Sequence, residues 1–219
     1  MTELHIKFDF KARYYKLGEV NSETKQVWFV FHGYGQLAQY FIKKFAALES
    51  KKICVIAPEG LSKFYLENVA SRSAGGNNRV GATWMTREDR EVDIENYINY
   101  LQQVYDKEIG NAKVNVTILG FSQGAATATR WALTRKPSFE RFILWAGIFP
   151  PDMNFERGKE ILGKKKVIAV YGSDDPFVTA PRMQEMLELS SKLELTPEKL
   201  DFAGKHEINE PLLLQIASS

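Results

Sequence analysis

The chain has 219 residues, and its 29 Lys and Arg against 27 Asp and Glu give a formal net charge of +2. Both signs are mixed along the sequence, which argues against a nucleic-acid-binding protein. Hydrophobic residues make up 44% and charged residues 26%, a composition that excludes a disordered chain. A chain of this length can bury roughly 70% of its unfolded surface in one core, so we expect residues 1–219 to form a single domain.

The sequence carries no signal for export or for a membrane span. Residues 1–10 alternate polar and apolar side chains and lack the basic start and apolar run of a secretory signal. No stretch approaches 18 uninterrupted apolar residues. The one cysteine, Cys54, has no partner for an internal disulfide and lies in an apolar run that predicts a buried thiol. We therefore expect a cytoplasmic protein, as a monomer or homodimer, with no integral membrane segment.

The first expected element is a strand over residues 4–10, where apolar and polar side chains alternate, with residues 12–17 returning beside it. Later apolar runs are short, continuous and rich in β-branched or aromatic residues, as in strands buried on both faces. These runs are residues 27–31, 53–57, 114–119, 142–146 and 167–171.

Segments with helical spacing separate these runs, at residues 37–48 and 94–105. Thr86 and Asp89 have the spacing of a capping box before the second. Alternating strands and helices predict an α/β fold: a mostly parallel twisted sheet with antiparallel N-terminal edge strands and helices on both faces. Residues 58–83 form the longest irregular stretch, and its glycine-rich part, residues 71–80, is either a functional loop or a surface excursion.

A nucleophile elbow is predicted at Gly120-Phe121-Ser122-Gln123-Gly124, which has the G-x-S-x-G pattern. An apolar run enters it, and an Ala/Thr/Trp segment compatible with a helix leaves it. The strand, sharp turn and helix would hold Ser122 exposed at the tip, and the two glycines would let neighbouring backbone pass close by. A serine hydroxyl needs a base before it can act as a nucleophile.

The chain has three histidines from which that base can come. His5 lies in the expected N-terminal strand, and His32 precedes a Gly-x-Gly turn, where we interpret it as structural. His206 lies in a loop between an expected strand at residues 199–202 and an apolar terminal helix. We expect His206 to be the base, because the alternative, His32, would reverse the order of the triad in an α/β hydrolase.

A carboxylate between Ser122 and His206 should orient the imidazole. Asp174 and Asp175 both follow the apolar run 167–171 directly, and position alone allows either of them. The oxyanion hole is assigned to the backbone N–H groups of Tyr34 and Gln123, because the turn at Phe31-His32-Gly33-Tyr34-Gly35 follows an expected strand.

These segments together resemble the phospholipase/carboxylesterase family of α/β hydrolases, which includes carboxylesterases, lysophospholipases and acyl-protein thioesterases. The resemblance covers nearly the whole chain and includes the oxyanion loop, the elbow, the acid loop at residues 172–178 and Gly204-Lys205-His206. It implies an α/β-hydrolase fold without a cap domain. It also selects Asp175, the aspartate directly before the proline, as the acid.

The sequence departs from the family pattern at Gln36, Thr86 and Thr179, where many relatives carry an acid, an acid and a proline. None of these positions belongs to the triad. Trp84, in the family's tryptophan-containing segment, and Phe177 are the expected apolar substrate contacts. No Cys/His cluster has metal-ligand spacing, so we expect no metal and no cofactor.

The leading functional hypothesis is a serine hydrolase that cleaves small or medium acyl esters through an acyl-enzyme on Ser122, with His206 as base and Asp175 as its orienting acid. A lysophospholipase or an acyl-protein thioesterase would use the same residues. A third hypothesis, from another class, is a hydrolase-like binding protein without catalytic activity.

Overall fold

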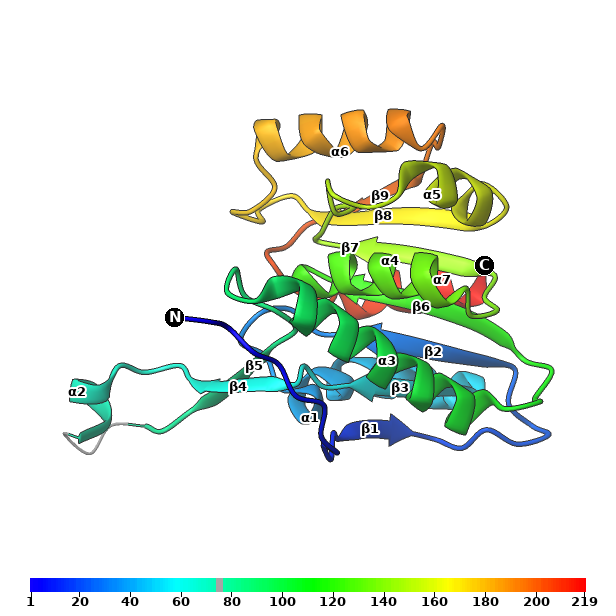
Figure 1. Ribbon diagram of the computed structural model, residues 1–219. Coiled ribbons are helices and arrows are strands. Elements are labelled where there is room, and N and C mark those ends of the chain that lie inside the picture. Colours follow the sequence, from blue (N-terminus) through cyan, green and yellow to red (C-terminus); the bar gives the residue numbers. More distant parts are fainter. Residues whose placement is uncertain (74–76) are drawn as a thin grey trace.

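The computed structural model describes residues 1–73 and 77–219 (Figure 1). In this part of the chain, seven strands form one sheet in the order β1-β3-β2-β6-β7-β8-β9, and β4 and β5 form a separate pair. The strands of the main sheet are β1 (Tyr14–Leu17), β2 (Gln26–Phe31), β3 (Ile53–Pro58), β6 (Asn115–Phe121), β7 (Arg141–Trp145), β8 (Lys166–Gly172) and β9 (Glu198–Phe202). Neighbouring strands are parallel except β1 and β3, which confirms a mostly parallel sheet with an antiparallel edge.

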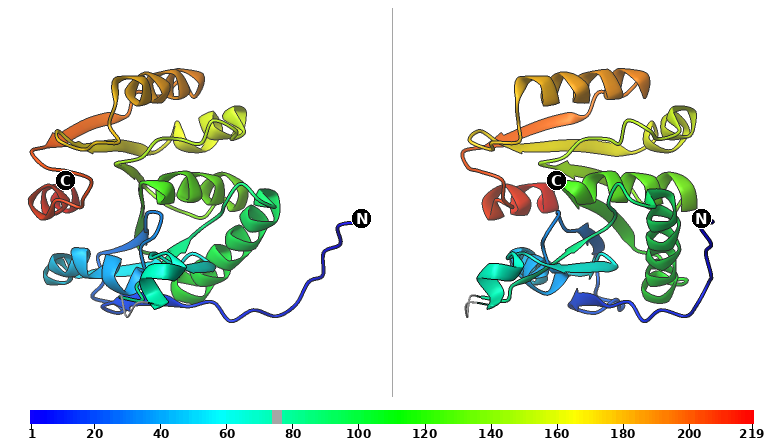
Figure 2. Two further views of the ribbon diagram at one scale, coloured as in Figure 1. Left: turned by 90° about the vertical axis from the view of Figure 1, so that its left-hand side faces the viewer. Right: turned by 60° about the vertical axis from the view of Figure 1, so that its left-hand side comes forward.

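Helices cover both faces of the sheet, as Figure 2 shows. The helices are α1 (Ala38–Phe41), the 3₁₀ helix η1 (Ile42–Lys51), α2 (Val69–Ser73), α3 (Arg90–Ile109), α4 (Gln123–Arg135), α5 (Phe155–Leu162), α6 (Ala180–Lys192) and α7 (Glu210–Ser218). Side chains of α3, α4, α5 and α6 share one buried cluster with Phe29, whereas those of α1, η1 and α7 share the other with Trp28. Successive strand residues therefore point to opposite layers, which explains why the strand sequences are continuously apolar. Among the described residues, no helix combines the length and hydropathy needed to cross a bilayer.

The strand expected at residues 4–10 does not form. Residues 1–13 have no regular secondary structure and run as an extended arm that leaves the body of the protein (Figure 2). Leu4, Ile6 and Phe8 are 85%, 87% and 76% exposed. Alternation predicts which side chains would share a face, but a strand also needs a neighbouring backbone, and β1 begins to pair with β3 only at Tyr14.

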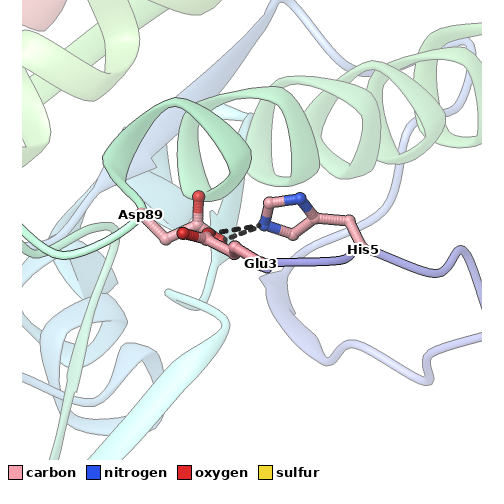
Figure 3. Close-up of side chains that lie close together, drawn as sticks. All are labelled: Glu3, His5 and Asp89. Carbon is pink, nitrogen blue, oxygen red and sulfur yellow. Dashed lines mark hydrogen bonds and ion pairs between the residues drawn. The ribbon is translucent and has the colours of Figure 1, made fainter. Parts of the chain in front are cut away.

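Two surface contacts tie this arm to α3. His5 Nε2 lies 2.9 Å from Asp89 Oδ2 and 3.3 Å from Glu3 Oε1, and Figure 3 shows the three side chains meeting at the start of α3. Lys7 Nζ lies 3.6 Å from Glu95 Oε1. All of these side chains are exposed. Pairs of this kind contribute at most about 1 kcal/mol, so the arm is weakly held.

The first strong attachment of the N-terminal segment is at Arg13. Glu59 directly follows β3 and is 1% exposed, and its carboxylate accepts hydrogen bonds from Arg13 Nε at 2.6 Å and Arg13 Nη2 at 3.3 Å. The N–H of Ala38 at the start of α1 donates to the same carboxylate at 3.1 Å. A buried carboxylate needs such partners, so Arg13 and Glu59 together fix the edge of the sheet to α1.

Residues 58–83, expected to be irregular, instead contain an antiparallel pair of strands, which we call the β4–β5 hairpin. Strands β4 (Ser62–Tyr65) and β5 (Val80–Thr83) pair throughout, and α2 lies near the tip, which projects beyond the main sheet in Figure 1. Ser62 pairs with Thr83 at the base of the hairpin. Each of these strands has only four residues, which is too short for a clear alternation of apolar and polar side chains. The sequence therefore did not reveal either strand. The glycine-rich expectation at residues 71–80 is only partly testable, because residues 74–76 lie outside the described residues.

The predicted capping box before α3 does not form, so this prediction was wrong. Asp89 is the N-cap residue with φ 44°, and its side chain makes no capping hydrogen bond. Thr86 N instead donates to Asp93 Oδ2 at 3.2 Å, and Thr86 Oγ1 donates to the carbonyl of Glu88 at 3.3 Å. The left-handed backbone at Asp89 turns the chain away from capping geometry, and its carboxylate binds His5 instead.

We predict that deleting residues 1–11 lowers the free energy of unfolding by less than about 1 kcal/mol, because the arm buries little and its ion pairs are exposed. Arg13→Gln in the full chain should lower it by about 2 kcal/mol, because Glu59 then loses a charged hydrogen-bond donor. Urea denaturation followed by tryptophan fluorescence measures both. A larger loss from the deletion than from Arg13→Gln would contradict this description of the arm.

Candidate active site

Ser122 occupies a strained turn between β6 and α4, with φ 54° and ψ −117°. Close contacts between backbone segments at three neighbouring glycines hold it there. A Cβ on Gly124 would meet the carbonyl oxygen of Phe31, one on Gly147 would lie 2.8 Å from the carbonyl oxygen of Ser122, and one on Gly120 would meet the backbone of Ala125. Glycine is required at these positions because any side chain would force the strands and helix apart. Such positive-φ serines cost of order 1–3 kcal/mol and persist where surrounding structure imposes them.

The predicted acid and base lie in hydrogen-bond contact. Asp175 Oδ2 lies 2.7 Å from His206 Nδ1, and Asp175 Oδ1 accepts a hydrogen bond from the N–H of Phe177 at 2.9 Å. The Asp175 side chain is fully buried, and that of His206 is 21% exposed. Asp174, which position alone allowed equally, is exposed. The structure thus brings together the Asp175 and His206 pair, as the resemblance implied.

His206 lies beside the elbow. Its ring is centred 4.7 Å from the ring of Phe121, the residue before Ser122, and 4.7 Å from the ring of Phe177. Among the residues that the structure describes, no hydrogen bond joins Ser122 to His206, whose Nδ1 is instead engaged by Asp175. A serine hydroxyl rotates freely, and contacts of this kind often tighten only when substrate binds.

The turn after β2 presents a free backbone donor. Gly35 N donates to Ala82 O at 2.9 Å, whereas the N–H of Tyr34 donates to no acceptor in the described part of the chain. Gln123 is the first residue of α4, where helical hydrogen bonding leaves N–H groups unpaired. A Cβ on Gly33 would lie 3.2 Å from Ser122 Cβ, so this turn packs directly against the elbow. The two amides assigned to the oxyanion hole therefore belong to backbone segments that touch each other.

His32 is a buried structural residue. Its Nδ1 lies 2.8 Å from Gly33 O, and its Nε2 accepts a hydrogen bond from Gly60 N at 2.9 Å, so the ring is neutral with its proton on Nδ1. Burial lowers the pKa of His32 to about 4, despite the carbonyl of Gly33 and the charge of Glu59, which act in the opposite direction. With both ring nitrogens engaged, His32 cannot take a proton from Ser122.

Trp84 supports the turn at residues 31–35 through its contacts with His32. It is 1% exposed, its ring stacks on His32 with centroids 4.8 Å apart, and its Nε1 donates to His32 O at 2.9 Å. The structure places it outside the lining of the pocket at Ser122, and its neighbour Met85 lines that pocket instead. The expected contact between Trp84 and substrate therefore does not fit its position.

The side chain of Gln123 has a role that the sequence did not indicate. Its Nε2 donates to Thr83 Oγ1 at 2.9 Å and to Met85 O at 3.1 Å, and its Oε1 accepts from Trp84 N at 3.3 Å. One residue therefore carries a candidate oxyanion donor on its backbone and joins α4 to the end of β5 with its side chain. The sequence signal for this role was only a glutamine directly after the elbow serine, and it does not indicate which groups the glutamine side chain binds.

A pocket of about 510 Å³ opens beside Ser122. Its walls come from α4, from the loop after β7 and from the start of α6, and Phe177, 65% exposed, lies at its edge. The lining residues are Met85, Ser122, Gln123, Ala126, Thr127, Arg130, Ala146, Gly147, Ile148, Phe149, Pro150, Pro151, Tyr171, Pro176, Phe177, Val178, Thr179, Arg182 and Met183. This volume and this mostly apolar lining are typical of small-molecule sites.

Comparison with known proteins places the chain in a family. Residues 16–219 match the phospholipase/carboxylesterase family over nearly the full length. The chain belongs to this family. Curated proteins give no significant sequence match.

Solved structures with the same fold include esterase PE8, at 19% identity and a TM-score of 0.68, with 95% of this chain and 97% of that chain covered. Acyl-protein thioesterase 2 of Zea mays has 13% identity and a TM-score of 0.65 with the same coverage. A carboxylesterase of Mesorhizobium loti has 13% identity and a TM-score of 0.65, covering 94% and 92%. At these identities the likeness establishes the α/β-hydrolase fold, and family membership supports an ester hydrolase.

In this member of the phospholipase/carboxylesterase family, Gln36 is one of the positions where we expect a departure from the family pattern. Gln36 Oε1 accepts a hydrogen bond from Gly33 N at 2.8 Å, and Gln36 O accepts from Ala82 N at 3.2 Å. An amide oxygen serves as acceptor here as a carboxylate would, without placing a negative charge beside the amides of the turn. The departure therefore preserves the turn.

We predict that buried, neutral His32 makes the free energy of unfolding decrease as the pH drops from 6.5 towards 4. The unfolded chain protonates His32 near its ordinary pKa of 6.5, whereas the folded chain resists protonation until about pH 4. The unfolded state therefore binds the extra proton within this window, and the free energy of unfolding decreases by about 3 kcal/mol. Urea denaturation across the window measures the slope. His32→Gln, less stable at neutral pH, should lose most of this slope, and an unchanged slope would contradict the assignment.

Proposed function

We propose that this chain hydrolyses carboxylic esters through an acyl-enzyme on Ser122. The observation that carries the proposal is the buried Asp175 carboxylate in hydrogen-bond contact with His206, whose ring packs against the residue preceding the strained serine. A histidine held by its Nδ1 presents Nε2 as the free base. The strand, turn and helix around Ser122 support its role as the nucleophile.

The proposed reaction has two steps. His206 takes the Ser122 proton as the Oγ attacks the ester carbonyl, and the resulting oxyanion is stabilised by the N–H groups of Tyr34 and Gln123. His206 then gives that proton to the leaving alcohol as the acyl-enzyme forms. In the second step, His206 activates a water that attacks the acyl-enzyme, releases the carboxylic acid and returns the proton to Ser122. Asp175 remains ionised and stabilises the imidazolium in both steps.

Within this proposal, we infer that the acyl group is small or medium in size. The pocket volume of about 510 Å³ suits a small molecule. The side chains of Phe149, Pro150 and Phe177 form an apolar wall. A lysophospholipase or acyl-protein thioesterase would use the same serine, so a series of acyl chain lengths separates these substrate classes from a small-ester hydrolase.

We predict that Ser122→Ala abolishes labelling by a fluorophosphonate and lowers the kcat for p-nitrophenyl acetate by about 10⁶-fold, because the nucleophile is removed while the elbow remains. Denaturation measurements should show a folded variant. Turnover of p-nitrophenyl esters should fall as the acyl chain lengthens. Rising turnover would favour the lipid or thioester classes, and absence of labelling in the wild-type protein would favour a binding protein.

The adjacent aspartates offer a matched test of the acid. Asp175→Asn should lower kcat by about 10³- to 10⁴-fold, because an amide no longer stabilises the imidazolium. Asp174→Asn changes the same charge one residue away, on an exposed side chain, and should leave kcat within about twofold. Steady-state kinetics with p-nitrophenyl acetate measure both. Equal effects of the two substitutions would remove Asp175 from the proposed triad.

A further inference from the structure

One face of α4 forms a wall of the pocket at Ser122. Gln123, Ala126, Thr127 and Arg130 line it, with the spacing of side chains stacked along one side of a helix. The helix therefore leads from the nucleophile, at its N-terminal end, to an arginine two turns further along. This distance is about 12 Å along the helix axis.

Among the described residues, the charged side chains that line the pocket are cationic. Two arginines line it, Arg130 from α4 and Arg182 from α6, and none of the lining residues that the structure describes is acidic. The remaining lining is mainly apolar. Charged groups along a mostly apolar wall attract a ligand of opposite charge more strongly than they would in water.

Arg130 keeps donor capacity after its structural contacts are counted. Its Nη2 donates to Asp152 Oδ1 at 2.7 Å, and its Nη1 lies 3.8 Å from Met85 Sδ, a weak acceptor. A guanidinium has five N–H groups, so further donors remain. Asp152 is shared with Arg90, whose Nη2 donates to its other oxygen. Although burial opposes the shift, hydrogen bonds from Arg90 and Arg130 lower the pKa of Asp152 to about 2. Asp152 is thus shared by two guanidiniums, and Arg90 also pairs with Glu91 at 3.0 Å, so Arg130 does not have this carboxylate to itself.

Arg182 provides the second cation at the start of α6. Its Nη1 lies 2.8 Å from Glu185 Oε2, one turn along the same helix, and the two side chains are 49% and 38% exposed. Exposed pairs of this type contribute little energy. A ligand anion in the pocket can therefore compete for Arg182 at small cost.

We propose that the preferred substrate is an ester that carries a carboxylate on its acyl or its alcohol part, which Arg130 and Arg182 bind while Ser122 attacks the ester carbonyl. This inference rests on the proposed function and names the substrate class of the same site. Arginine suits the task because its planar guanidinium can bind a carboxylate through two parallel hydrogen bonds.

The test compares esters that differ only in that charge. Mono-p-nitrophenyl adipate and its methyl-capped diester vary the acyl part, and the acetate of 4-hydroxyphenylacetic acid and its methyl ester vary the alcohol part. For at least one pair, wild-type kcat/KM should be higher for the anionic ester by about tenfold or more, the value of one charge-assisted hydrogen bond. The difference should arise mainly in KM and should shrink as salt is added.

Arg182→Gln is the main variant, because Arg182 is half-exposed and its loss leaves the core intact. It should lower the anionic-to-neutral ratio severalfold, because the lost cation is a partner only for the anionic ester. Arg130→Gln should lower the ratio further, although it also removes a partner of Asp152. Arg135→Gln is the matched control, since Arg135 is on the same helix outside the pocket lining and should keep the wild-type ratio. The ratio is the readout because a purely structural loss lowers both rates together.

The outcomes separate the two proposals. If the neutral esters are hydrolysed in a manner that depends on Ser122 but neither anionic ester is preferred, the carboxylate inference is wrong and the ester-hydrolase proposal stands. A preference that persists in Arg182→Gln and Arg130→Gln also overturns the inference. If no ester is hydrolysed and Ser122 does not react with the fluorophosphonate, the proposed function itself fails.

Discussion

The backbone at Ser122 is the constraint on which the site depends. A serine at φ 54° and ψ −117° is held because Gly124 and Gly147 let the end of β2 and the loop after β7 come into contact with the turn, and Gly120 lets the start of α4 fold back on β6. The same turn sets the position of Gln123 at the start of α4 and of Phe121 against His206. Because β6 lies between β2 and β7 in the sheet, contacts from both sides oppose relaxation of this turn. The backbone strain is thus maintained by the packing of the whole sheet.

A second layer of contacts holds the turn at residues 31–35 in place. His32, neutral and buried, uses both ring nitrogens to hold backbone, and Trp84 stacks on it. Gln123 then joins the elbow to the base of the β4–β5 hairpin. Amides that stabilise an oxyanion must be aimed before the reaction begins, since reorientation during the reaction would consume the benefit. In the mechanism that we propose, these buried groups hold the amides of Tyr34 and Gln123 in place.

The sequence predicted those parts of the fold whose signals are local. The buried strands were predicted correctly because residues such as Val27 and Val167 sit in apolar runs that both layers of helices cover. The arm at residues 4–10 has an equally clear pattern, yet no strand formed, since pairing depends on backbone from elsewhere. The hydrogen bond of Asp175 with His206 followed from motif order and from the resemblance. Arg130 and Arg182 were missed because nothing in either local sequence indicates that α4 and α6 border one pocket.

The hairpin of β4 and β5 separates a fixed part from a variable one. Its base is secured at Thr83 and at Met85 by Gln123, while its tip, with α2, projects beyond the main sheet (Figure 1). Changes in the length or composition of the tip would therefore leave the hydrogen bonds at the base undisturbed. In evolution or in the laboratory, the tip is a place where new surface can be added to this hydrolase scaffold without re-optimising its reaction centre.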